Sequence, residues 1–175
     1  IGGGSTEFIL DRPDRKPIVQ SIDIGVVRLC ERVLHHDPPS DGEVRQAREW
    51  VRRETKTAVA EMTGFETATF VGTAGTVTSL AAMAQKLPTY ESARIHNYVL
   101  KLETIRELEQ TLLSGTKAER VGLPGLEKNR EEVIAAGAII IRTIMETLGL
   151  QSVLVSDLGL REGVLIDLER QAGNR

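Results

Sequence analysis

Three glycine-rich turns contain the residues of this sequence that could bind an anion. The first opens the chain as Ile1-Gly-Gly-Gly-Ser-Thr-Glu7. Consecutive glycines let the backbone approach an oxyanion closely and expose several N–H donors to it, and the two hydroxyls add further donors. The residues expected to bind phosphate here are Gly2, Gly3, Gly4, Ser5 and Thr6. The alternative is a glycine-rich hairpin loop without a ligand.

Glu7 places a carboxylate directly beside this loop. A carboxylate alone would repel a phosphate, so its position makes sense if a Mg²⁺ ion or an activated water lies between the two. We therefore expect Glu7 to be a metal ligand. The competing interpretation is a solvated strand residue.

The second turn is Gly72-Thr-Ala-Gly-Thr76. It follows Ala68–Val71, which has the composition of a short buried strand, and it precedes a helical pattern that Pro88 closes. A helix beginning there would direct its N-terminal N–H groups at the loop. The expected loop residues are Gly72, Thr73, Ala74, Gly75 and Thr76. An ordinary strand-to-helix connection with Thr76 as N-cap explains the same pattern.

The third turn, residues 156–163, again lies between a predicted strand and a predicted helix. Arg161 could bind a phosphate with two parallel hydrogen bonds. It could equally pair with Asp157 or Glu162, and for Glu162 we favour a structural role.

Composition and missing motifs exclude several other functions. The net charge of −3 and the aromatic content of 3% do not favour nucleic-acid binding. No turn has the Walker A or Rossmann spacing, and one cysteine without a HExxH motif argues against zinc. The longest apolar stretch, Ala135–Ile141, is too short to span a bilayer. Cys30 alone cannot form a disulfide framework, which favours the cytoplasm, and a start without methionine suggests residues upstream of Ile1.

Hydrophobic periodicity predicts an α/β arrangement around these turns. Glu7–Leu10 and Ile18–Ile24 should form a β-hairpin with its turn at 11–17, whereas Gly25–Leu34 fits either a helix or a third strand. A capping box at Ser40–Glu43 should begin an amphipathic helix that ends near Gly64.

The second half of the chain is predicted to be mainly helical. Leu102, Ile105, Leu108 and Leu112 mark one helix. A longer one, from about Asn129 to Leu148, is apolar on so wide a surface that it should be buried on more than one side. Gln151–Val155 is the last predicted strand, and Leu158–Gly163 should turn into a short final helix.

Together the three turns resemble one family, the Ppx/GppA phosphatases. The resemblance lies in IGGGSTE at 1–7, VGTAGTVTSLAAM at 71–83 and SDLGLREGVL at 156–165, in the same order and spacing. It implies a ribonuclease-H-like fold of the actin/Hsp70/sugar-kinase superfamily, with a mixed sheet and packed helices. Residues 1–175 would be a single domain, the C-terminal lobe of a two-lobe enzyme whose N-terminal lobe is absent.

The same resemblance implies a cytoplasmic, Mg²⁺-dependent hydrolase that cleaves terminal phosphoanhydride bonds of inorganic polyphosphate or guanosine pentaphosphate. Its catalytic base would be a Glu of the missing lobe, so no catalytic residue is expected in this chain. The 72–76 loop would face a nucleoside, and Arg130 would contact phosphates.

Two other functions remain open at this stage. One is a regulatory module that binds an alarmone or polyphosphate without hydrolysing it, and the other is a small-molecule kinase of the same superfamily. We also expect the exposed cleft face to favour self-association, for example as a homodimer. Neither nucleic acid nor a membrane is an expected partner.

Overall fold

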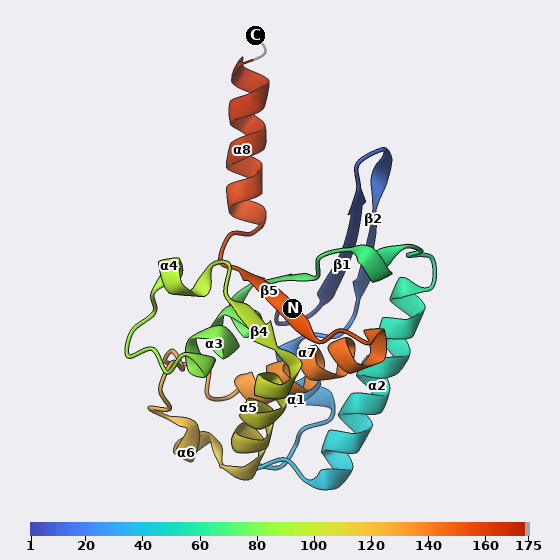
Figure 1. Cartoon of the computed structure of the whole chain (residues 1–175). Helices are drawn as coiled ribbons and strands as arrows, with labels where there is room; N and C mark the ends of the chain where they lie inside the picture. Colours follow the sequence, from blue (N-terminus) through green and yellow to red (C-terminus); the bar gives the residue numbers. More distant parts are fainter. Residues whose placement is uncertain (174–175) are drawn as a thin grey trace.

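The computed structural model describes residues 1–173, with Glu66 described by its backbone alone (Figure 1). In chain order the elements are β1 (Thr6–Arg12), β2 (Arg15–Ile22), α1 (Val26–Arg32), α2 (Asp41–Val59), the 3₁₀ turn η1 (Phe65–Thr67), β3 (Val71–Thr73), α3 (Gly75–Ala84), α4 (Ser92–Ile95), β4 (Val99–Lys101), α5 (Leu102–Ser114), α6 (Lys117–Arg120), α7 (Ile134–Leu148), β5 (Ser152–Ser156) and α8 (Leu160–Gly173).

The strands form two sheets. β1 and β2 pair as an antiparallel hairpin, as the sequence predicted. The second sheet has the order β3-β5-β4, in which β3 runs parallel and β4 antiparallel to β5. The molecule is therefore an α/β fold with a mixed sheet and packed helices, and the fold-class prediction is confirmed.

α7 is the central helix of the core and divides it into two hydrophobic clusters. Ala138 and Met145 pack into the cluster formed with α3, α5 and β5. Ile139, Ile140 and Ile144 pack into the cluster formed with the hairpin, α1 and α2. The predicted burial of this helix on more than one side is confirmed, and α7 thereby fixes the sheet and the hairpin relative to each other.

The strand predicted at Ala68–Val71 was misplaced. Pairing with β5 begins at Val71, so β3 occupies Val71–Thr73 rather than Ala68–Val71. The glycine explains the error, because Gly72 is the buried residue of this strand and not the first residue of the loop. A Cβ at Gly72 would lie 2.8 Å from Cγ2 of Val153 and 3.0 Å from Cγ1 of Val77, so glycine leaves the space that these side chains occupy.

Several helix boundaries also differ from the prediction. α2 ends at Val59, before Gly64. α7 begins at Ile134 and not at Asn129, because Asn129 has a left-handed φ of 68° that is incompatible with a helix. α1 settles the ambiguous segment after the hairpin as a helix. β4 was missed, since three residues carry too little periodicity to be recognised.

α8 extends away from the rest of the molecule (Figure 1). It is 14 residues long, whereas a short helix was predicted, and none of its side chains is buried. Leu160, Leu165 and Leu168 are among its exposed apolar side chains. None of the helices within residues 1–173 is long and apolar enough to cross a membrane.

The predicted capping box of α2 is confirmed and makes a pH-dependent contribution to stability testable. Burial acts to raise the pKa of Glu43, but hydrogen bonds from His36, Ser40 and His35 outweigh it and lower the pKa to about 2. A carboxyl whose folded-state pKa is depressed stabilises the fold above its unfolded value. That contribution is lost as the pH falls from about 4.5 to about 2.

We therefore expect Glu43→Gln to lower the free energy of unfolding by about 1 kcal/mol at pH 7, the size of a charge interaction at a helix terminus. The difference from the unmodified chain should disappear near pH 2, as measured by urea unfolding across this range. Glu49→Gln, at an exposed position in the middle of α2, is the matched control. A difference that stays constant down to pH 2 would contradict the assignment.

Candidate anion-binding site

The carbonyl groups of the first glycine loop are directed at the N-terminus of α1. The backbone N–H groups of Val26 and Val27 donate to the carbonyls of Gly2 and Gly3, at 3.0 and 2.9 Å. The first N–H groups of a helix have no partner within the helix, so these carbonyls serve as its cap. The loop before β1 is thus attached to α1 through its acceptors alone.

This attachment leaves the donors of the loop free. In a planar trans peptide the N–H points away from the carbonyl of the same unit. The carbonyls of Gly2, Gly3 and Gly4 share their peptide units with the N–H groups of Gly3, Gly4 and Ser5, respectively. Because these carbonyls face α1, the three N–H groups point away from it. Within residues 1–173 these three N–H groups have no hydrogen-bond partner. Consecutive free N–H groups of this kind are the donors that a backbone anion site uses.

Two residues that sequence reasoning missed hold this loop. Arg28 donates from Nε to the carbonyl of Gly4 at 2.8 Å and pairs with Asp23 at 3.3 Å, which places a guanidinium beside the loop. Gly25 lies against the loop backbone, and a Cβ there would be 2.3 Å from the carbonyl oxygen of Gly3. Both are more than 20 residues from the loop in the sequence, so no local pattern indicated them.

The two hydroxyls of the first loop have different surroundings. Thr6 is buried, and its Oγ1 donates to the carbonyl of Ile24 at 2.7 Å. Its hydroxyl is therefore committed to the fold, and the structure does not present it to a ligand as the sequence suggested. Ser5 donates its hydroxyl to Oε1 of Glu7 at 2.6 Å, and Ser21 donates to the same oxygen at 3.2 Å.

Glu7 can provide one oxygen to a hard divalent cation. It is exposed, and both serine hydroxyls meet Oε1, so Oε2 has no side-chain hydrogen bond among the described residues. Mg²⁺ is commonly held by one or two carboxylates together with waters and substrate phosphates, and Glu7 fits that requirement in part. Residues 1–173 contain no group of three acidic, histidine or cysteine side chains that could hold a metal by itself.

The second loop combines free donors with a strained residue. Ala74 precedes α3 with φ 72° and ψ 171°, a conformation that costs an alanine about 1–3 kcal/mol. Its carbonyl accepts from Val77 and Thr78, while the N–H groups of Gly75 and Thr76 have no partner in the described part of the chain. Strain of this kind is often found at binding loops, where the surrounding structure maintains it.

The structure brings Arg130 to the second loop. Glu127 accepts from its Nε at 3.0 Å, and its guanidinium covers Gly75 so closely that a Cβ there would lie 2.2 Å from Nη1. The glycine thus provides the space that the arginine occupies. Arg130 therefore places a guanidinium, paired with Glu127, beside the N-terminus of α3.

The third loop packs against the second. Thr73 donates its hydroxyl to the carbonyl of Leu158 at 2.9 Å. Tyr90, which sequence reasoning missed, donates to the carboxylate of Asp157; burial and this bond raise the pKa of Tyr90 to about 12. Glu162 accepts from the N–H of Gly159 at 2.7 Å, which agrees with a structural role for this residue.

Arg161 is the one candidate that lies apart from the others. It is exposed in the first turn of α8 and, within residues 1–173, forms no hydrogen bond or ion pair with either glycine loop. The structure therefore gives it no contact that would place it at the site.

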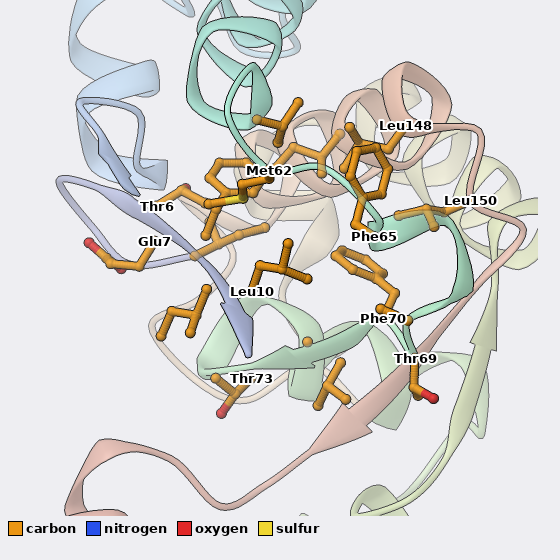
Figure 2. Close-up of a pocket in the computed structure, with 18 of the residues that line it drawn as sticks. Thr6, Glu7, Leu10, Met62, Phe65, Thr69, Phe70, Thr73, Leu148 and Leu150 are labelled. Atoms are coloured by element: carbon orange, nitrogen blue, oxygen red, sulfur yellow. The ribbon is translucent and has the colours of Figure 1, made fainter. Parts of the chain in front are cut away.

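Residues beside the first and second loops line one cavity. Its volume is about 500 Å³, and its lining includes Glu7 and Thr73 (Figure 2). Most of the lining is apolar, so the interior of the cavity does not suit an anion. The three loops predicted from the sequence are therefore neighbours in space.

Comparison with known proteins identifies the relatives of this chain. Residues 1–172 match the Ppx/GppA phosphatase family. The chain is 36% identical over 172 residues to Exopolyphosphatase 2 of Mycobacterium tuberculosis, covering 96% of the chain and 54% of that protein. It is also 28% identical to a bifunctional 3-dehydroquinate synthase/phosphatase of Fusobacterium nucleatum, covering 95% of the chain and 25% of that protein.

Solved structures show the same relationship. The crystal structure of the Aquifex aeolicus member of the Ppx/GppA family superposes with a TM-score of 0.87 at 32% identity, covering 99% of this chain and 55% of that one. An exopolyphosphatase-like protein superposes with a TM-score of 0.89 at 26% identity, covering 98% of this chain and 58% of that one. The chain thus spans about half the length of Exopolyphosphatase 2 and of these two solved structures.

Two glycine substitutions should have different effects on stability. Gly25→Ala would drive a Cβ into the rigid backbone of Gly3, so we expect the free energy of unfolding to fall by about 1–3 kcal/mol. Gly75→Ala meets the movable end of Arg130 instead, so it should leave stability nearly unchanged and displace the guanidinium. Chemical unfolding measures the first effect and a crystal structure of the variant the second. Equal stability of the two variants would contradict the constraint assigned to Gly25.

Proposed function

This chain belongs to the Ppx/GppA phosphatase family, and from that premise we propose that it forms one lobe of a two-lobe phosphohydrolase. The longer protein would remove terminal phosphates from inorganic polyphosphate or from guanosine pentaphosphate. Residues 1–175 would supply one wall of the cleft, and the other lobe would supply the catalytic base and a further phosphate loop. We place this protein in the cytoplasm, because Cys30 is a free cysteine and a reducing compartment keeps thiols reduced.

The observation that carries this proposal is the row of free N–H groups in the first glycine loop. Because the carbonyls of that loop are held by α1, its N–H donors are already oriented away from the helix and could bind an oxyanion without a change in loop conformation. The free N–H groups of Gly75 and Thr76, together with Arg130 beside Gly75, would provide a second set of contacts. Arg28 would add a positive charge at the first loop.

In this proposal the chain contributes positioning and charge stabilisation. Cleavage of a phosphoanhydride is catalysed mainly by positioning and by hydrogen-bond donors and cations that stabilise charge on the non-bridging oxygens. Glu7 would hold Mg²⁺ through Oε2 or orient the attacking water, and Ser5 and Ser21 would fix the carboxylate by their bonds to Oε1. Mg²⁺, when bound, would offset phosphate charge.

The longer enzyme carrying Glu7→Gln tests the role of this carboxylate. We expect kcat to fall by roughly 10²-fold or more, because an amide neither holds the metal nor biases the water. The Tm should barely change, since the side chain is exposed and the amide can still accept from Ser5. Phosphate release from both substrates with Mg²⁺ is the measurement, and Glu49→Gln is the control. Unchanged turnover would show that Glu7 is a solvated strand residue without a catalytic role.

The 175-residue chain alone should fold but release phosphate at least roughly 10²-fold more slowly than the longer enzyme, because one wall of the cleft cannot position the reactants. The exposed apolar side chains of α8 should also favour its self-association. Turnover equal to that of the longer enzyme would show that the base lies within this chain.

If the longer protein binds polyphosphate but releases no phosphate, the regulatory alternative is correct.

A further inference from the structure

The third carbonyl of the first glycine loop is held by a side chain and not by the backbone of α1. Backbone N–H groups of α1 donate to the carbonyls of Gly2 and Gly3, whereas the carbonyl of Gly4 accepts from Nε of Arg28 at 2.8 Å. Within residues 1–173 no other group donates to this third carbonyl. The orientation of the peptide unit between Gly4 and Ser5 therefore depends on one side chain.

The guanidinium of Arg28 lies on the side of this peptide unit opposite to its N–H group. In a planar trans peptide the carbonyl of Gly4 and the N–H of Ser5 point in opposite directions. Because Nε of Arg28 meets the carbonyl, the arginine can act through the peptide unit on an oxyanion at the N–H. A charged donor at a carbonyl also polarises the peptide, and this strengthens the N–H as a donor.

Further contacts hold the guanidinium and connect the peptide unit to Glu7. Asp23 pairs with Nη2 of Arg28 at 3.3 Å, and the arginine side chain is only 30% exposed. Ser5 accepts at its carbonyl from the N–H of Gly2 and donates its hydroxyl to Oε1 of Glu7 at 2.6 Å. A rotation of the peptide unit before Ser5 would therefore move this hydroxyl and release the carboxylate.

We propose that Arg28 is a positioning residue of the candidate anion-binding site. It sets the direction of the Ser5 N–H, which completes the row of three free donors, and it holds Glu7 in place through the Ser5 hydroxyl. This role rests on the phosphate binding proposed above for the first loop. It differs from the effect of a nearby positive charge, because it requires a donor at the position of Nε.

Three substitutions separate the donor from the charge. In Arg28→Gln the amide nitrogen takes the place of Nε, since both atoms follow Cδ, so this variant keeps the donor and loses the charge. Arg28→Met keeps neither the donor nor the charge. Arg28→Lys keeps the charge but has a carbon atom in place of Nε.

Amide chemical shifts of the 175-residue chain, followed by NMR during titration with inorganic pyrophosphate, show which donors bind. We expect the amides of Gly3, Gly4 and Ser5 to shift in the unmodified chain and in Arg28→Gln. In Arg28→Met and Arg28→Lys only the Ser5 amide should lose its shift at saturation, because α1 still holds the other two peptide units. The dissociation constant of these two variants should rise by about tenfold, the usual effect of losing one hydrogen bond.

The longer enzyme tests the connection to Glu7. Its kcat with Mg²⁺ should be about tenfold higher in Arg28→Gln than in Arg28→Met, because only the glutamine keeps the peptide unit, the Ser5 hydroxyl and the carboxylate in register. Neither variant carries the charge, so the charge cannot cause this difference. Equal kcat in the two variants would overturn the connection to Glu7.

Three results of the titration would overturn the proposal. Loss of the Ser5 shift in Arg28→Gln would make the charge the essential property, and its retention in Arg28→Met would make Arg28 dispensable. The third is the absence of a Ser5 shift in the unmodified chain. If Arg28→Met or Arg28→Lys fails to fold, the other gives the same comparison. The titration requires no turnover, so a longer protein without phosphate release would contradict the proposed function and not this role of Arg28.

Discussion

The contact between the first glycine loop and α1 is the constraint on which the candidate site depends. A peptide unit has one donor and one acceptor on opposite sides, so fixing the acceptors of Gly2 and Gly3 also fixes where the neighbouring donors point. The helix gains a cap and the loop gains a defined shape from the same hydrogen bonds. Gly25 makes this possible because the two backbones come too close for any side chain between them.

The remaining parts of the site are placed by α7 and the sheet. α7 packs against α1 on one side and against α3 on the other, so it determines the relative positions of the two helices that receive the glycine loops. A Cβ at Gly137 of α7 would lie 2.6 Å from Cγ2 of Thr76, which shows how closely α7 packs against the start of α3. Except for Thr143, the buried residues of this central helix are apolar or glycine, so it can make such contacts on more than one side.

Local features could be predicted from the sequence and distant ones could not. The capping box at Ser40 and the hairpin of β1 and β2 follow from neighbouring residues, and the structure contains both. The cover that Arg130 forms over Gly75 joins residues 55 positions apart, and the conformation of Ala74 is one that alanine rarely adopts. The three loops were recognisable because glycine, serine and threonine cluster in them. The inward orientation of Thr6 could not be predicted, because its hydrogen-bond partner is a backbone carbonyl.

The free donors of Gly3, Gly4 and Ser5 belong to the main chain, and this has a consequence for how the site would behave. Amide groups do not titrate in the physiological range, so the attraction they exert on an anion would not vary with acidity as that of a histidine does. Main-chain donors are also retained whatever the side chain. Replacing the neighbouring side chains that do not hold these peptide planes by alanine would therefore leave this part of the recognition intact, whereas a substitution that displaces the peptide planes, as a Cβ at Gly25 would, should disturb it.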